Sequence, residues 1–272
     1  MTIRTRFLSG IVLFCLLSAP ALVGAQASDE TGKSKGWDLR VDEFDLDANE
    51  FKHETRFGLV FVTGNTQSLT LSGSSYTLWR IKRWENKWKL GALFNRIYTS
   101  TNSTATPGTI ARYIYGTYRL DYYLTERFTL FLGGGGYTDE IKGMDLSTMA
   151  FAGASYFFWK NPRTYLRGSL GYNYTFEDPV APNPNDHIHS IGEELEFLYK
   201  FNDNVSFFQN VNALESVENG RDTRINSDTE IKAGVSKHFA IVTAFRLRFD
   251  NQPVPGFKKL DTITDVSLAA TF

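Results

Sequence analysis

The last fourteen residues of the chain, 259–272, read KLDTITDVSLAATF. Alternate residues from Leu260 to Phe272 are apolar or weakly polar, whereas the residues between them include the carboxylates Asp261 and Asp265. Alternation with a period of two is typical of a β-strand whose two faces meet different surroundings. Such a strand fits a membrane barrel, because in lipid only a closed barrel leaves no strand edge unpaired. The stretch therefore predicts the closing strand of a membrane β-barrel.

The rest of the chain repeats this alternation between turn-forming segments and predicts twelve strands in all. The eleven earlier strands are expected at residues 57–63, 69–80, 88–98, 110–124, 128–138, 148–159, 164–176, 189–201, 205–214, 224–238 and 241–250. Connections after even-numbered strands are short and those after odd-numbered strands are longer, except at Gly64 and Asn65. Outer-membrane barrels show this asymmetry and an even number of strands. The predicted fold is all-β, a closed antiparallel transmembrane β-barrel with up-and-down topology.

The chain divides into three predicted parts. Residues 1–27 have two arginines, a short apolar run and small residues at a cleavage site, which predicts a cleaved signal peptide rather than a membrane anchor. Cleavage removes Cys15, the one cysteine of the chain, so no disulfide is expected. Residues 28–53 are acidic and predict a periplasmic lead-in, with a short plug inside the barrel as the alternative. Residues 54–272 are assigned to the barrel.

Composition narrows the classes of partner. The net charge of −1 provides no basic surface for nucleic acid. No run of eighteen apolar residues follows the signal segment, which excludes helical membrane spans. Aromatic residues make up 15% of the chain, as suits a barrel with half of each strand polar. We expect outer-membrane lipids and lipopolysaccharide as surroundings, small solutes in the lumen, and the barrel-assembly machinery as a partner of the strand that ends in Phe272.

On most strands the charged residues fall mainly on one parity. A lipid-facing Arg or Lys at mid-membrane costs about 2–4 kcal/mol, so these residues are expected to face the lumen. The lumen-lining candidates are Arg119, Asp121, Arg167, Glu194, Glu196, Asp228, Glu230, Lys232, Arg246, Arg248, Asp261 and Asp265. They predict a ladder of ion pairs, with a transport path as the alternative, and their mixed signs argue against strong ion selectivity. The facing of residues 128–138 and 148–159 stays open, because both parities are apolar.

Aromatic residues are expected to form two belts at the membrane interfaces rather than the core of a soluble β-sandwich. The belt beside the short turns would hold Trp79, Trp84, Trp88, Tyr122, Phe158, Trp159, Tyr199, Phe201, Phe239 and Phe272, and the belt beside the long loops Tyr98, Tyr137, Tyr174 and Phe176.

Catalytic patterns are weak. His187, His189 and Ser190 suggest a metal pair or a lipid hydrolase, but they lack a third ligand or a visible base at a suitable spacing. Glu194 and Glu196 have a spacing of about 6.6–6.8 Å along a strand, near that of glycosidase carboxylates, but we assign them to lumen ion pairs instead. We predict no enzyme activity, no cofactor and no metal. A barrel-embedded phospholipase-like hydrolase and a soluble periplasmic β protein remain the alternatives.

The chain resembles a known family over residues 55–272. Residues 57–60 with the sequence TGNT at 63–66, and residues 119–124 with the Gly-rich 131–139, are similar to the YdiY-like domain-of-unknown-function family, described as salt-induced outer-membrane proteins. The resemblance implies an outer-membrane barrel linked to salt or osmotic stress and brings no catalytic residues. The resulting prediction is a Gram-negative outer-membrane protein with a structural or narrow-channel role.

Overall fold

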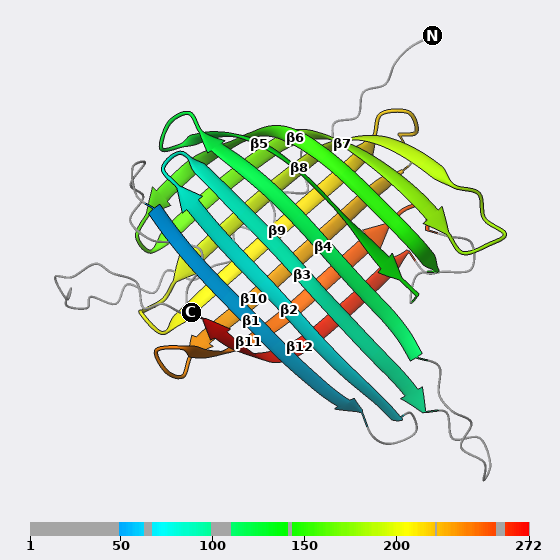
Figure 1. Ribbon diagram of the computed structural model, residues 1–272, viewed down its shortest axis with the longest axis horizontal. Coiled ribbons are helices and arrows are strands. Elements are labelled where there is room, and N and C mark those ends of the chain that lie inside the picture. The colour runs from blue at the N-terminus through cyan, green and yellow to red at the C-terminus, as the bar shows by residue number, and fades with distance from the viewer. Residues whose placement is uncertain are drawn as a thin grey trace. The chain divides into compact units, whose positions relative to one another are not determined.

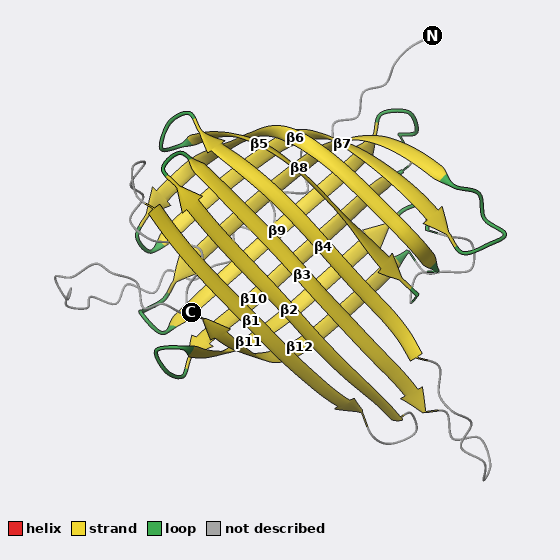
Figure 2. Ribbon diagram, in the orientation of Figure 1, coloured by secondary structure: helices red, strands yellow, loops and turns green. Residues whose placement is uncertain are grey.

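Twelve antiparallel strands make up the described part of the chain in the computed structural model, which covers residues 49–62, 67–98, 110–140, 143–220, 222–253 and 259–271 (Figures 1 and 2). The strands are β1 Asn49–Val62, β2 Gln67–Ile81, β3 Trp84–Tyr98, β4 Ile110–Tyr123, β5 Phe128–Asp139, β6 Met144–Asn161, β7 Thr164–Pro179, β8 Asp186–Lys200, β9 Val205–Ser216, β10 Thr223–Gly234, β11 Phe239–Asp250 and β12 Leu260–Thr271. In these ranges we find no helix with the length and apolarity needed to cross a membrane.

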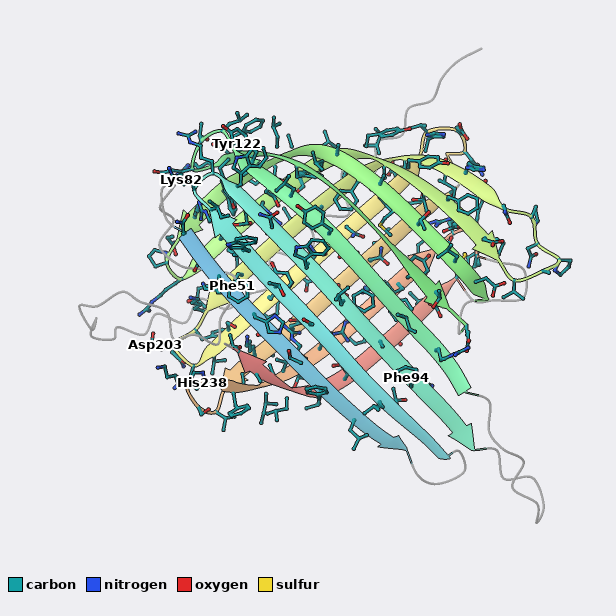
Figure 3. All side chains as sticks on the ribbon, viewed as in Figure 1. Phe51, Lys82, Phe94, Tyr122, Asp203 and His238 are labelled. Atoms are coloured by element: carbon teal, nitrogen blue, oxygen red, sulfur yellow. The ribbon has the colours of Figure 1, made fainter. Side chains whose placement is uncertain are left out.

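Each strand pairs with its neighbours in sequence, and β1 pairs with β12, so the sheet closes into a barrel. The predicted strand number, antiparallel pairing and up-and-down order are confirmed. Two residues connect β2 to β3 and β6 to β7, whereas eleven separate β3 from β4. Figure 3 places Lys82, Asp203 and His238, from three of the short connections, at one end of the barrel. We call this the short-turn end and the opposite one the loop end.

Several bounds differ from expectation. β1 begins at Asn49, five residues before the predicted start of the barrel at residue 54, because its first residues pair with the end of β2. β3 begins at Trp84 rather than residue 88, since the positive φ of Lys82 (52°) allows a two-residue turn. The predicted signal peptide, most of the acidic lead-in and Phe272 lie outside the described residues.

Side chains alternate between the two faces of the barrel wall. Phe57 (65% exposed), Leu132 (54%) and Leu170 (58%) point outward, whereas the charged residues between the outward positions are mostly shielded. The outer face is therefore apolar over most of its height, as hydrocarbon requires. This arrangement is a closed cylinder and not the two stacked sheets of a soluble sandwich.

The structure decides the facing of β5 and β6, which the sequence leaves open, and their glycines make room for it. Leu130 and Leu132 are exposed on the outside, so Phe131 points into the lumen. The end of its ring lies 2.7 Å from the place where a Cβ on Gly153 would be, and Phe151 likewise covers Gly133. Glycines thus hollow the inner wall so that inward aromatic rings fit.

Aromatic residues gather at both ends of the outer face. At the short-turn end Trp84 lies 4.6 Å from Tyr122, and Tyr199 lies 5.1 Å from Phe201, between ring centroids. At the loop end Phe176 lies 5.1 Å from His187, which joins the belt there. The prediction that Tyr137 belongs to this belt is wrong. Tyr137 shares the parity of Phe131 on β5, so it faces inward, and its ring centroid lies 6.0 Å from that of Tyr113.

Candidate functional site: the ion-paired lumen

The first part of the lumen network lies on β10, β11 and β12. Strand register sets Asp228 opposite Arg246 and Asn226 opposite Arg248, so the arginines meet acids on the diagonal. Arg248 Nη1 lies 2.6 Å from Asp228 Oδ1, and Arg246 pairs with Asp265 on β12. Arg246 also approaches Glu230, at 4.0 Å. Acidic and basic side chains therefore lie side by side on this wall.

A second group of ion pairs joins β1 to β10. Arg56 donates hydrogen bonds to Glu54 (2.6 Å) on its own strand and to Glu230 (3.0 Å) on β10. Lys232 donates to Glu54, whose side chain is almost fully buried. Since β11 and β12 lie between these strands in the sheet, both contacts reach over the inner face of the two intervening strands. We call Glu54, Arg56, Glu230 and Lys232 the β1–β10 clamp.

A third group crosses the lumen from β4 to β8. Arg119 binds Asp121 through two guanidinium nitrogens and reaches Glu194 at 3.1 Å, four strands away. Its guanidinium also lies 4.0 Å from the centre of the Phe131 ring, a cation–π contact. Asp121 is fully buried and receives a hydrogen bond from Lys87 on β3 (3.2 Å). Charged side chains of β3, β4 and β8 are thereby linked in one layer.

Two further pairs belong to the network. Arg167 lies directly opposite Glu196 in the β7–β8 register and pairs with it. Near the loop end, Arg224 on β10 makes a two-pronged contact with Glu177 on β7, with Nη2 to Oε2 at 3.1 Å. Arg224 also touches Asp222, the last residue of the β9–β10 loop, where burial raises the pKa of the carboxyl against the opposing effect of Arg224. The loop end is thus cross-linked by charge between β7 and β10.

An apolar cluster lies inside the short-turn end. It consists of Tyr123, Phe157, Tyr165, Leu198 and Phe208, each at most 8% exposed. These side chains come from β4, β6, β7, β8 and β9, so the cluster reaches from one wall to strands five places away. Tyr123 donates a hydrogen bond to Glu85 (3.2 Å), which ties it to the charged layer above. We call this cluster the aromatic floor, because it packs inside the short-turn end next to the charged layer.

The twelve lumen-lining candidates lie on β4, β7, β8, β10, β11 and β12. Eleven of the twelve carry described side chains on the inner face, while for Asp261 the structure describes the backbone alone, opposite Arg248. Sequence reasoning missed Glu54, Arg56, Lys87, Glu177 and Arg224 as partners. Alternation places each on the inner parity, but Glu54 stood at the edge of the lead-in, and Lys87 and Glu177 lie one residue outside the expected strands 88–98 and 164–176. Arg56 and Arg224 each pair with a strand three places away in the sheet.

The histidine and serine candidates do not form a catalytic group. His187 and His189 point outward and accept or donate hydrogen bonds with Tyr174 (2.7 Å) and Tyr172, respectively. Ser190 points inward and is 3% exposed, because adjacent strand residues face opposite sides. The wall of the barrel thus separates the serine from both histidines, which belong to the loop-end belt. Within the described ranges, no three His, Cys, Asp or Glu residues are placed to hold a metal ion.

Comparison with known proteins gives a family and a set of barrels. A model of the family described as "Protein of unknown function, DUF481" matches residues 55–272. No curated protein matches the chain. Among solved structures, an outer-membrane channel from Pseudomonas putida F1 is 13% identical, with 86% of this chain and 100% of that chain covered and a TM-score of 0.49. The NanC porin is 9% identical, with 80% and 98% covered and a TM-score of 0.47. The CymD monoaromatic hydrocarbon channel is 9% identical, with 84% and 90% covered and a TM-score of 0.41.

Proposed function

This chain belongs to the DUF481 family of proteins of unknown function, which supplies no activity, and we propose that it is an outer-membrane barrel acting as a narrow channel for small polar solutes. The observation that carries the proposal is the polar inner face, where charged side chains retain access to water. Among the lumen residues, the side chains of Asp228, Arg248 and Arg246 are 30%, 26% and 27% exposed.

The aromatic floor sets the width of the proposed path. Leu198 is 1% exposed and Tyr123 3% exposed, so these side chains are shielded from water at the short-turn end. A solute entering from the loop end would meet the charged layer and then this floor. We therefore expect a small conductance that depends on movement of the floor side chains.

The proposed channel has little preference for the sign of an ion. In the ladder on β10–β12, Arg246 and Arg248 stand beside Asp228, Glu230 and Asp265, and the signs alternate along the wall. Alternating fixed charges give a weak net field at the axis of a pore, whereas rings of one sign select for the opposite ion. Small neutral and zwitterionic solutes fit this lumen best.

Conductance in a planar lipid bilayer tests the proposal. The wild-type barrel should give small current steps with weak selectivity. A Leu198→Ala/Phe208→Ala variant should enlarge the steps by opening the floor, while Leu132→Ala, a change on the outer face, should leave them unchanged. An Arg246→Ala/Arg248→Ala variant should shift the preference toward cations. Silence of all variants, including the floor variant, would favour a purely structural barrel.

The proposal also includes location and regulation. We place the barrel in the outer membrane of a Gram-negative bacterium after export, in contact with lipids and lipopolysaccharide, with Phe272 read by the assembly machinery. The family resemblance links it to salt or osmotic stress. Fractionation of cells would test the location, and growth of a deletion strain at raised salt would test the link to stress. Absence of the protein from the outer-membrane fraction would contradict the location. Unchanged growth of the deletion strain at raised salt would contradict the link to stress.

A further inference from the structure

The seam between β1 and β12 is much shorter than any other strand contact among the described residues. It holds five residue pairs, from Glu54 with Thr271 to Gly58 with Ser267. Every other neighbouring pair of strands has at least eleven, and β7 with β8 has fourteen. In Figure 1 the two strands meet near the C label and separate toward the loop end.

Both strands continue beyond the seam toward the loop end. Residues 59–62 of β1 pair with β2, and residues 260–266 of β12 pair with β11, but the register does not join them to each other. Unpaired backbone groups cost several kcal/mol each in hydrocarbon. The backbone groups left unpaired along residues 59–62 and 260–266 are therefore stable when water or a polar ligand group in the lumen forms hydrogen bonds with them.

The β1–β10 clamp acts on the paired part of the seam. Glu54 and Arg56 both lie within the five pairs, and their contacts with Lys232 and Glu230 hold β1 against β10 across the inner face. The short-turn part of the seam is thus fixed twice, by backbone pairs and by charge. Beyond Gly58, neither contact is seen in the described residues.

The open part of the seam has two chemically different sides. On the inside, next to β12, lies Arg246 of β11, which is paired with Asp265, lies 4.0 Å from Glu230 and is 27% exposed. On the outside, Leu59 and Val266 are 52% and 53% exposed and face the same surroundings as the rest of the apolar wall. A cation beside an apolar edge matches a molecule with an anionic head and an apolar chain.

We propose that the loop-side half of the β1–β12 seam is a lateral opening between the lumen and the lipid, which binds single-chain amphiphiles with an anionic head group. The head lies toward Arg246, where it competes with Asp265 and Glu230, and the chain lies along Leu59 and Val266. The inference rests on the proposed function in that both need a membrane-embedded barrel, but a solute using this opening would bypass the aromatic floor.

Cysteine pairs across the seam test the opening, since the predicted mature chain has no cysteine. Phe57→Cys/Leu268→Cys lies inside the seam, and Phe61→Cys/Thr264→Cys would be the same kind of ladder position if the register continued. Disulfides form when the two Cα atoms lie within about 7 Å. With mild oxidation of the barrel in phospholipid vesicles, the first pair should cross-link and the second should not. Equal cross-linking of the two pairs overturns the opening.

A photoreactive palmitate analogue tests the ligand. After irradiation in vesicles, peptides containing Leu59 and Val266 should carry the label several-fold above the outward β5 segment near Leu132. Arg246→Gln should reduce this labelling several-fold, whereas Lys89→Gln, which removes an inward cation on β3, should leave it unchanged. Uniform labelling of the outer wall, or an equal effect of both variants, overturns the amphiphile site. Neither readout needs ion current, so a silent bilayer experiment would reject the channel alone.

Discussion

Glu193 and Glu194 offer a direct test of the barrel's two faces, because adjacent carboxylates point to opposite sides. Glu193 is exposed on the outer face, with Leu170 and Ala213 as its register partners. It lies four residues from His189 and four from Phe197, about 13 Å along the strand in either direction. This places a carboxylate near the middle of the apolar band. The facing of Glu193 is an exception to the rule that charged residues point inward.

The two glutamates should respond oppositely to removal. A lipid-facing Arg or Lys at the midplane costs about 2–4 kcal/mol and a carboxylate less, so Glu193→Leu should raise the free energy of unfolding by about 1–2 kcal/mol. Glu194 receives hydrogen bonds from Arg119 (3.1 Å) and Asn210 (2.8 Å). Breaking a fully buried pair costs about 3–5 kcal/mol, and partial exposure of Glu194 with the remaining Arg119–Asp121 contact reduces Glu194→Leu to a loss of about 2 kcal/mol.

Urea or guanidinium unfolding of the barrel in phospholipid vesicles, followed by tryptophan fluorescence and by the mobility of folded and unfolded forms on gels, measures both changes. The two variants share the same substitution and neighbouring positions, so each is the control of the other. If both variants lose stability to a similar degree, or if Glu193→Leu is the more harmful, the assignment of faces on β8 is wrong.

Three further predictions concern the lumen and its ends. Lys232→Met should cost about 3–5 kcal/mol in the same unfolding assay because it leaves Arg56 as the one remaining cation beside buried Glu54, which then keeps a long hydrogen bond from the Thr271 hydroxyl (3.4 Å). Glu54→Gln/Lys232→Met should recover part of the loss, and an additive double variant would contradict the clamp. Gly153→Val should reduce folding yield sharply, since even a Cβ there meets the Leu170 carbonyl and the Phe131 ring, whereas Ala152→Val on the outer face should be tolerated. Burial raises the pKa of Asp222, so its favourable contribution to stability is present at low pH and fades as pH rises through the folded-state pKa; Asp222→Asn should remove this part of the pH dependence of unfolding, and an unchanged profile would contradict it.

The sequence by itself determined the strand number, the up-and-down order and most of the facing. Period-two alternation assigns each side chain to one wall or the other, because a strand turns each residue by half a revolution. Leu166 and Leu170 outward with Arg167 and Ser169 inward follow from that rule alone. The rule gives no answer where both parities are apolar, as on β5 and β6. Tyr137 was placed outward by its position near a long loop rather than by alternation, and that placement was wrong.

Tertiary structure decided which charges meet. Alternation predicts that Arg119 and Glu194 both face the lumen. Their contact joins β4 to β8, however, and so depends on the tilt and stagger of the closed sheet. The same holds for Glu54 with Lys232, for the aromatic floor and for the short seam of five pairs between β1 and β12. The local sequence pattern determines which face of the barrel wall a side chain occupies. The partner that it meets across the lumen is determined by how the twelve strands close into a barrel, and the sequence of a single strand does not contain that information.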